Sequence, residues 1–186
     1  GTPYDDLWSF DPAKGAWSPL APPKAERAKQ VAAHSWPAGR SYGSLNTYLN
    51  PVSSAPSLAL FGGANCSRGC KCKGDTWLWD LAAQQFTLVQ VEKGTEPVPR
   101  YRQSLSEYKG SIYVFGGESY KPYMYHNSVS KLTLSAHGGG RRAAIAAAPA
   151  GAEGRPESVL GGSGAAALLL SVGVLAALVA GRQAWR

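Results

Sequence analysis

Phe61-Gly62-Gly63 and Phe115-Gly116-Gly117 are two copies of one tripeptide, and each copy ends a short run of aliphatic or β-branched residues. A loop and another strand-like segment follow each of them. A repeated unit of this kind exposes a face that it cannot bury alone, so neighbouring units have to stack on one another. The chain is therefore predicted to be a repeat protein. Glycines after a buried strand permit backbone geometry that a Cβ atom would obstruct.

The residues before the two tripeptides also match. An Arg and a Ser keep the same separation in both copies, as Arg40 with Ser44 and Arg100 with Ser104. The first copy is longer between its arginine and its glycines, and we place the insertion in the loop 50–55. The match therefore extends beyond the glycines themselves.

Large aromatic residues mark a further pair of strands in each unit. The segment 75–80 follows the first glycine pair, and a weaker copy of it follows the second at 127–132. Aromatic residues nine positions apart fit two antiparallel strands joined by a turn. They are Trp8 and Trp17 in one pair, and Trp77 and Phe86 in the other. These large apolar side chains are expected to pack one unit on the next.

Together, the arginines, the glycine pairs and the spaced aromatic residues resemble the kelch repeat, in which one repeat forms one four-stranded blade of a β-propeller. The resemblance covers residues 1–137 and implies an all-β fold, a partial kelch-type β-propeller of about two to three blades of antiparallel strands. Counting strands in kelch order gives two, then four, then three. Propellers close with about four to eight blades. We therefore expect a C-terminal piece of a longer protein, whose N-terminal end would supply the missing last strand.

The C-terminal segment is predicted to cross a membrane. Residues 160–181 carry no charged residue and are about as long as a helix needs to span a bilayer. Residues 138–159 are rich in Gly, Ala and Pro, which predicts a disordered stalk. Basic residues in the tail 182–186 favour a cytosolic C-terminus, so the propeller would be extracellular or lumenal. A buried core helix and a cleaved lipid-anchor signal at 161–165 are the alternatives.

All three cysteines, Cys66, Cys70 and Cys72, lie in the loop after the first glycine pair. In an oxidising compartment one pair of them is expected to form a disulfide, and the sequence does not decide which pair. A zinc site is the alternative, but it lacks a fourth ligand locally. Asn65 begins an Asn-x-Ser pattern and is a candidate glycosylation site.

The charge pattern does not suggest a nucleic-acid partner. The formal net charge is +7, but the basic residues are scattered and part of them lie outside the predicted propeller. Lys24, Arg27 and Lys29 lie in a Pro- and Ala-rich connection that is predicted to be a solvated loop. No acid–base pair, triad or phosphate loop is recognisable, so we predict neither catalysis nor a cofactor.

The candidate binding surface is the rim formed by the loops 64–74 and 118–127, which occupy equivalent positions in the two copies. The second loop contains Tyr120, Tyr123, Tyr125 and His126. Exposed tyrosines are enriched in recognition surfaces, although a loop packed on its own aromatic residues is the alternative. The function expected is binding of a protein or glycan by a membrane-anchored kelch protein.

Two other functions remain possible for a chain with this pattern. Galactose-oxidase-like copper enzymes also contain kelch-type blades. If this chain were part of such an enzyme, the blades that carry the active site would be absent from this sequence. Many kelch proteins are cytosolic adaptors instead, which only the predicted membrane span argues against.

Overall fold

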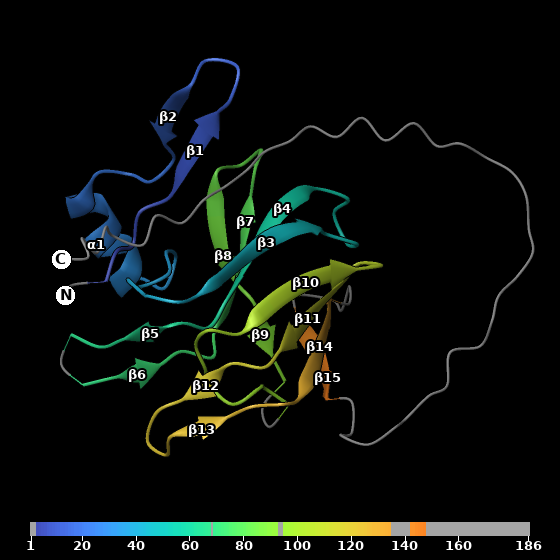
Figure 1. The fold of residues 1–186 in the computed structure, drawn as a ribbon. Helices are drawn as coiled ribbons and strands as arrows, with labels where there is room; N and C mark the ends of the chain where they lie inside the picture. The colour runs from blue at the N-terminus through green and yellow to red at the C-terminus, as the bar shows by residue number, and fades with distance from the viewer. Residues whose placement is uncertain (1–2, 68, 93–94, 135–141, 148–186) are drawn as a thin grey trace, which may run out of the picture.

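The computed structural model describes residues 3–67, 69–92, 95–134 and 142–147, and its fold is mostly β with several small sheets (Figure 1). The coarse prediction of a β-rich, mainly antiparallel fold is confirmed. One helix, α1 (Lys24–Ala32), replaces the loop predicted for Lys24, Arg27 and Lys29. Ala, Lys, Glu, Arg and Gln favour helices, and Arg27 fixes the helix by an ion pair to Asp5 of 3.0 Å.

The chain begins with a two-stranded antiparallel ribbon of β1 (Trp8–Asp11) and β2 (Ala16–Pro19). Trp17 pairs with Phe10 across this ribbon, with ring centroids 5.0 Å apart. Trp8 and Trp17 remain 37% and 45% exposed. The predicted strand pair is therefore present, but its outer surface is not covered by the described residues.

The first four-stranded sheet has the order β3-β4-β7-β8, all antiparallel. Its strands are β3 (Ser44–Leu49), β4 (Pro56–Phe61), β7 (Thr76–Asp80) and β8 (Gln85–Leu88). The small hairpin of β5 (Ala64–Asn65) and β6 (Lys71–Cys72) leaves this sheet after Gly63. The insertion loop predicted at 50–55 joins β3 to β4.

The second sheet has the order β10-β11-β14-β15-β9. Its strands are β10 (Ser104–Tyr108), β11 (Ser111–Phe115), β14 (Val129–Leu134), β15 (Arg142–Ala147) and the short β9 (Gln90–Val91), which pairs parallel with β15. A second hairpin, β12 (Glu118–Ser119) and β13 (Met124–Tyr125), leaves this sheet after Gly117.

Two sequence-based expectations are corrected by the second sheet. The sequence predicted only three strands there, with a disordered stalk over 138–159, but β15 lies in that range and pairs with β14. The match of the segment 75–80 to 127–132 is also shifted. Thr76 pairs with Phe61 and Val129 pairs with Phe115, so Asp75 corresponds to Ser128.

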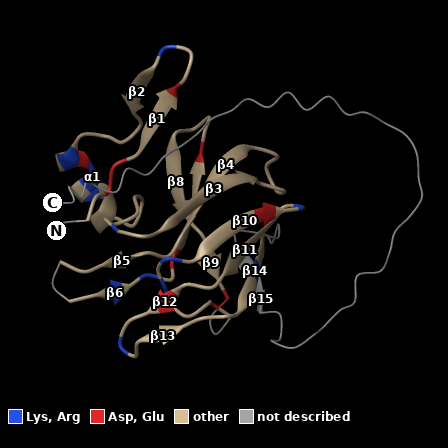
Figure 2. Ribbon diagram, viewed as in Figure 1, with Lys and Arg blue, Asp and Glu red and all other residues tan. Residues whose placement is uncertain are grey.

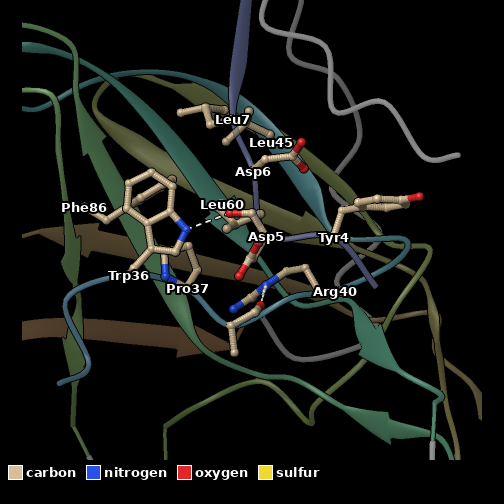
Figure 3. Close-up of a pocket in the computed structure, with 11 residues that line it drawn as sticks. Tyr4, Asp5, Asp6, Leu7, Trp36, Pro37, Arg40, Leu45, Leu60 and Phe86 are labelled. Atoms are coloured by element: carbon tan, nitrogen blue, oxygen red, sulfur yellow. Dashed lines mark hydrogen bonds between the residues drawn. The ribbon is translucent and has the colours of Figure 1, made fainter. Parts of the chain in front are cut away.

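Two apolar clusters cover the two faces of the first sheet. One cluster lies between the sheets and includes Phe61 and Ile112. The other contains Trp77 and Phe86 with Trp36, whose indole Nε1 donates 2.7 Å to the carbonyl of Asp5. The N-terminal segment 4–7 lies beside Trp36, and together they line a small pocket (Figure 3). The aromatic residues of the first sheet thus hold the N-terminal segment in place.

Within the described ranges, no helix is both long and apolar enough to cross a bilayer. The predicted membrane span at 160–181, the predicted tail at 182–186 and most of the predicted stalk lie outside the described residues.

Candidate functional site

Arg40 and Arg100 make the same contacts in the two copies. Both side chains are buried, and each guanidinium donates to the carbonyl of the first glycine of its pair, Arg40 to Gly62 at 2.9 Å and Arg100 to Gly116 at 3.0 Å. Each Nε also donates to the carbonyl two residues earlier in the chain. The two arginines therefore clamp the glycine pairs and hold the start of each hairpin.

The hairpins β5–β6 and β12–β13 begin in equivalent ways and leave the two sheets at the same end (Figure 1). Ser41 forms a bridge with Ala64, and Tyr101 forms the matching bridge with Glu118. The loops predicted to share one rim are thus at matching positions. Figure 2 shows basic residues distributed over several elements, including α1, β6 and the turn between β12 and β13.

Glu118, at the start of β12, organises the side chains on this rim. Its side chain is only 4% exposed and its carboxylate accepts hydrogen bonds from the Tyr123 hydroxyl at 2.5 Å and from Arg102 Nη1 at 2.5 Å. The hydrogen bond from Tyr123 and the charge of Arg102 lower the pKa of Glu118 against the effect of burial. The same carboxylate raises the pKa of Tyr123. Glu118 is therefore an ionised anchor for its neighbours.

Further aromatic residues extend this arrangement. The Tyr123 hydroxyl, whose proton goes to Glu118, accepts a hydrogen bond of 2.8 Å from the hydroxyl of Tyr125, and the two rings meet edge to face. The Arg102 guanidinium lies 4.8 Å from the ring centre of Tyr42 and 5.5 Å from that of Tyr101. We call the group formed by Tyr42, Tyr101, Arg102, Tyr123 and Tyr125 around Glu118 the tyrosine surface.

The backbone presents two members of the tyrosine surface in the same unusual way. Tyr42 and Arg102 each lie two residues after the clamping arginine of their copy, with φ values of +58° and +60°. Non-glycine residues rarely adopt this left-handed region. Such strain marks positions that the surrounding structure holds in place, and these occur often at binding sites.

Of the four predicted binding residues, the structure brings Tyr123 and Tyr125 together. Tyr120 is exposed, and the Lys121 ammonium lies 5.7 Å from its ring centre. His126 turns inward, so its Nε2 atom is buried without a hydrogen-bond partner. The sequence pattern did not identify Tyr42, Tyr101, Arg102 and Glu118, although the first three lie one or two residues after the repeat arginines.

The disulfide expected among the cysteines joins Cys66 and Cys70, and Cys72 is a free thiol. The bridge closes the tip of the β5–β6 hairpin. Nearby, the Asn65 side-chain oxygen accepts hydrogen bonds from the amide and the hydroxyl of Ser67. In the part of the chain that the structure describes, no group of three His, Cys, Asp or Glu residues is placed to hold a metal ion.

No family model matches this chain, and no curated protein matches it either. The geometry of the tyrosine surface is therefore the basis on which a function can be proposed.

Proposed function

We propose that this chain is part of a kelch-type β-propeller whose tyrosine surface binds a protein or glycan partner without catalysing a reaction. The observation that carries this proposal is the fixed arrangement of exposed tyrosines around one buried carboxylate. Tyr123 is 55% exposed and Tyr125 is 74% exposed, yet the hydroxyl of each takes part in a hydrogen bond.

An arrangement of this kind suits recognition. Tyr and Arg are enriched where binding energy is concentrated, because they offer large contact areas together with polar groups. Side chains that are already fixed lose less conformational entropy when a partner binds. Arg102, Tyr123 and Tyr125 are held in this way before any partner arrives, which favours a preformed binding surface.

The propeller part of the proposal is supported by how the two sheets meet. The Ser44 hydroxyl donates to the carbonyl of Gln103 at 2.5 Å, and the Asn46 amide donates to the carbonyl of Leu105 at 2.7 Å. Gln103 Nε2 donates back to the carbonyl of Phe61 at 2.9 Å. The first strands of the two units are thus neighbours, as adjacent blades around an axis would require. In this arrangement the β1–β2 ribbon is the outer half of a preceding blade.

We further propose that residues 160–181 span a membrane and place the tyrosine surface outside the cytosol. The Cys66–Cys70 disulfide favours an oxidising compartment. A glycosylation tag appended to the tail should stay unmodified in cells, while Asn65 can be modified. Modification of the tail alone would invert the proposed orientation.

The binding function is tested by screening the full chain, in detergent micelles, against arrays of extracellular proteins and of glycans. Tyr125→Ala should weaken any specific interaction at least about tenfold, as expected for a central interface residue. Tyr108→Ala is the matched control, because Tyr108 is 60% exposed but lies on β10 away from the tyrosine surface. Equal binding by both variants would refute the proposed surface. Copper content and peroxide release by the full-length protein would instead support the copper-enzyme alternative.

A further inference from the structure

The two copies of the repeat differ at one buried charge. In the first copy, the Arg40 guanidinium forms two hydrogen bonds of 2.8 Å to the carboxylate of Asp75. Asp75 also accepts a hydrogen bond from the Trp77 indole. In the second copy, the residue that corresponds to Asp75 is Ser128, whose hydroxyl lies 3.4 Å from Arg100 Nη1. Arg100 therefore faces a neutral group where Arg40 has an anion.

Arg100 is a poorly compensated cation. It is 2% exposed, and its other hydrogen bonds go to the carbonyls of Val98 and Gly116. Among the described residues, no carboxylate forms an ion pair with it. Burial lowers the pKa of Arg100. A buried charge without an opposite charge is costly, which makes this position favourable for an anion from outside.

His126 adds a second polar group to the same place. Both residues lie at Gly116: Arg100 donates to its carbonyl, and the carbonyl oxygen of His126 would lie 3.7 Å from a Cβ atom added to it. Burial, and then the charge of Arg100, lower the pKa of His126. The Nε2 atom of His126 is buried and has no hydrogen-bond partner. The His126 amide donates 2.9 Å to the carbonyl of Gly117 and closes the base of the hairpin that carries Tyr123 and Tyr125.

We propose that Arg100, His126 and Ser128 bind a glutamate side chain of a protein partner, at the place that Asp75 fills beside Arg40. This inference rests on the proposed function and narrows it to a protein ligand. Arginine binds carboxylates through two parallel hydrogen bonds, and serine and histidine can donate further ones. Because Arg100 is almost fully covered, the carboxylate has to enter on a slender stem. Two methylene groups of glutamate allow this, whereas the carboxylate of a uronic acid is attached directly to a bulky sugar ring.

Ser128→Asp provides the test, because it would place a carboxylate beside Arg100 as Asp75 does beside Arg40. The probes are a hexaglutamate peptide, hexaglutamine and trigalacturonate, each titrated into the full chain in detergent micelles. We expect hexaglutamate to bind the wild type, and Ser128→Asp to weaken this binding at least about tenfold, since a charge-assisted contact is lost. Hexaglutamine and trigalacturonate should bind far more weakly.

Two control variants separate this effect from general changes. Ser128→Asn has nearly the size of the aspartate variant without its charge, and Asn127→Asp adds the same charge at an exposed neighbouring residue. Both should bind hexaglutamate within about threefold of the wild type, well below the effect of losing a charge-assisted contact. Equal weakening by Asn127→Asp and Ser128→Asp, or binding of trigalacturonate in preference to hexaglutamate, would overturn the proposal.

An NMR measurement on the wild type gives an answer that does not depend on how the variants fold. Acetate should shift the Nε–Hε signal of Arg100 and leave that of Arg40, which is already paired, unchanged. Equal shifts of both signals, or none, would contradict the site. The tyrosine surface is tested separately, because hexaglutamate binding should survive Tyr125→Ala. Loss of partner binding in Tyr125→Ala with no effect of Ser128→Asp on hexaglutamate would leave the proposed function standing without this site.

Discussion

Replacing Gly62 by Ala should destabilise the fold far more than the same change at Gly116, although the two glycines are equivalent in the repeat. Both have a left-handed backbone, with φ values of +65° and +70°. A Cβ atom on Gly62 would lie 2.6 Å from the carbonyl oxygen of Arg100 and 3.0 Å from Gln103 Nε2. On Gly116, the nearest atom is the carbonyl oxygen of His126, at 3.7 Å.

The size of the difference follows from these distances. An alanine in the left-handed region costs about 1–2 kcal/mol at either position. The overlap at Gly62 adds about 1–3 kcal/mol, as for an overpacked core. The neighbouring atoms cannot easily move away from this overlap, because the Arg100 carbonyl accepts a hydrogen bond of 2.9 Å from the Gly63 amide and Gln103 donates one to the carbonyl of Phe61. We therefore expect Gly62→Ala to lose about 2–5 kcal/mol and Gly116→Ala about 1–2 kcal/mol.

Urea unfolding of the full chain, followed by tryptophan fluorescence and circular dichroism, measures both values. Gly15→Ala is a further control, since Gly15 has a φ of +62° and a Cβ atom added to it would have no neighbour within 4 Å. It should behave like Gly116→Ala. If Gly116→Ala lost as much stability as Gly62→Ala, the glycine pair would be explained by backbone conformation alone and not by contact between the sheets.

Three other predictions address charges and the disulfide. Asp75→Asn should lower the free energy of unfolding by about 3 kcal/mol, because it leaves a buried guanidinium without its anion. Burial opposes ionisation of Asp75, but its hydrogen bonds and nearby charges lower its pKa below 3.8. The stabilisation of the fold by the ionised carboxylate is therefore present above pH 3.8 and is lost as the pH falls further. Urea unfolding measured between about pH 6 and about pH 3 should show a smaller loss of free energy of unfolding in the variant than in the wild type. Replacing Cys66 and Cys70 by Ser should cost no more than about 2 kcal/mol in thermal unfolding, because the closed loop is short, and a larger loss would indicate that the bridge supports more than the hairpin tip. Glu118→Gln should lower the pKa of Tyr123, measured by ultraviolet titration, since the carboxylate that disfavours the phenolate is gone; an unchanged titration would contradict the proposed anchor.

The sequence predicts those parts of the fold that local patterns determine. The two runs of mostly apolar residues that end at Phe61 and Phe115, each followed by glycines, predict strands. The structure has strands at both places, β4 and β11. Strand β15 could not be predicted in this way. Its sequence Arg-Ala-Ala-Ile-Ala-Ala lacks alternation, and it becomes a strand by pairing with β14 and β9, of which β9 is distant in the chain. Helix α1 could have been predicted from its helix-forming residues, but Pro22 and Pro23 favoured a loop.

The candidate site was predictable only in part for a similar reason. Tyr123 and Tyr125 stand out because they are close in the sequence. Tyr42, by contrast, joins them through Arg102, and nothing local in the sequence relates these residues. The buried position of the His126 Nε2 atom is not marked by the local sequence either. Composition thus identifies a tyrosine-rich hairpin, whereas the partners that fix it are specified by the fold.

The two sheets also differ in what covers their equivalent faces, and this bears on the proposed architecture. Phe61 is 1% exposed because the second sheet covers it, whereas Phe115 is 53% exposed at the equivalent position. The opposite face of β11, with Ile112 and Val114, packs on the first sheet. The two sheets thus meet through opposite faces, and the face of the second sheet that carries Phe115 is exposed among the described residues. Gly116 lacks the close contact of Gly62 on this same side, since that contact comes from Arg100 and Gln103 of the following unit. A further unit stacked on Phe115, as the proposed propeller requires, would complete both features.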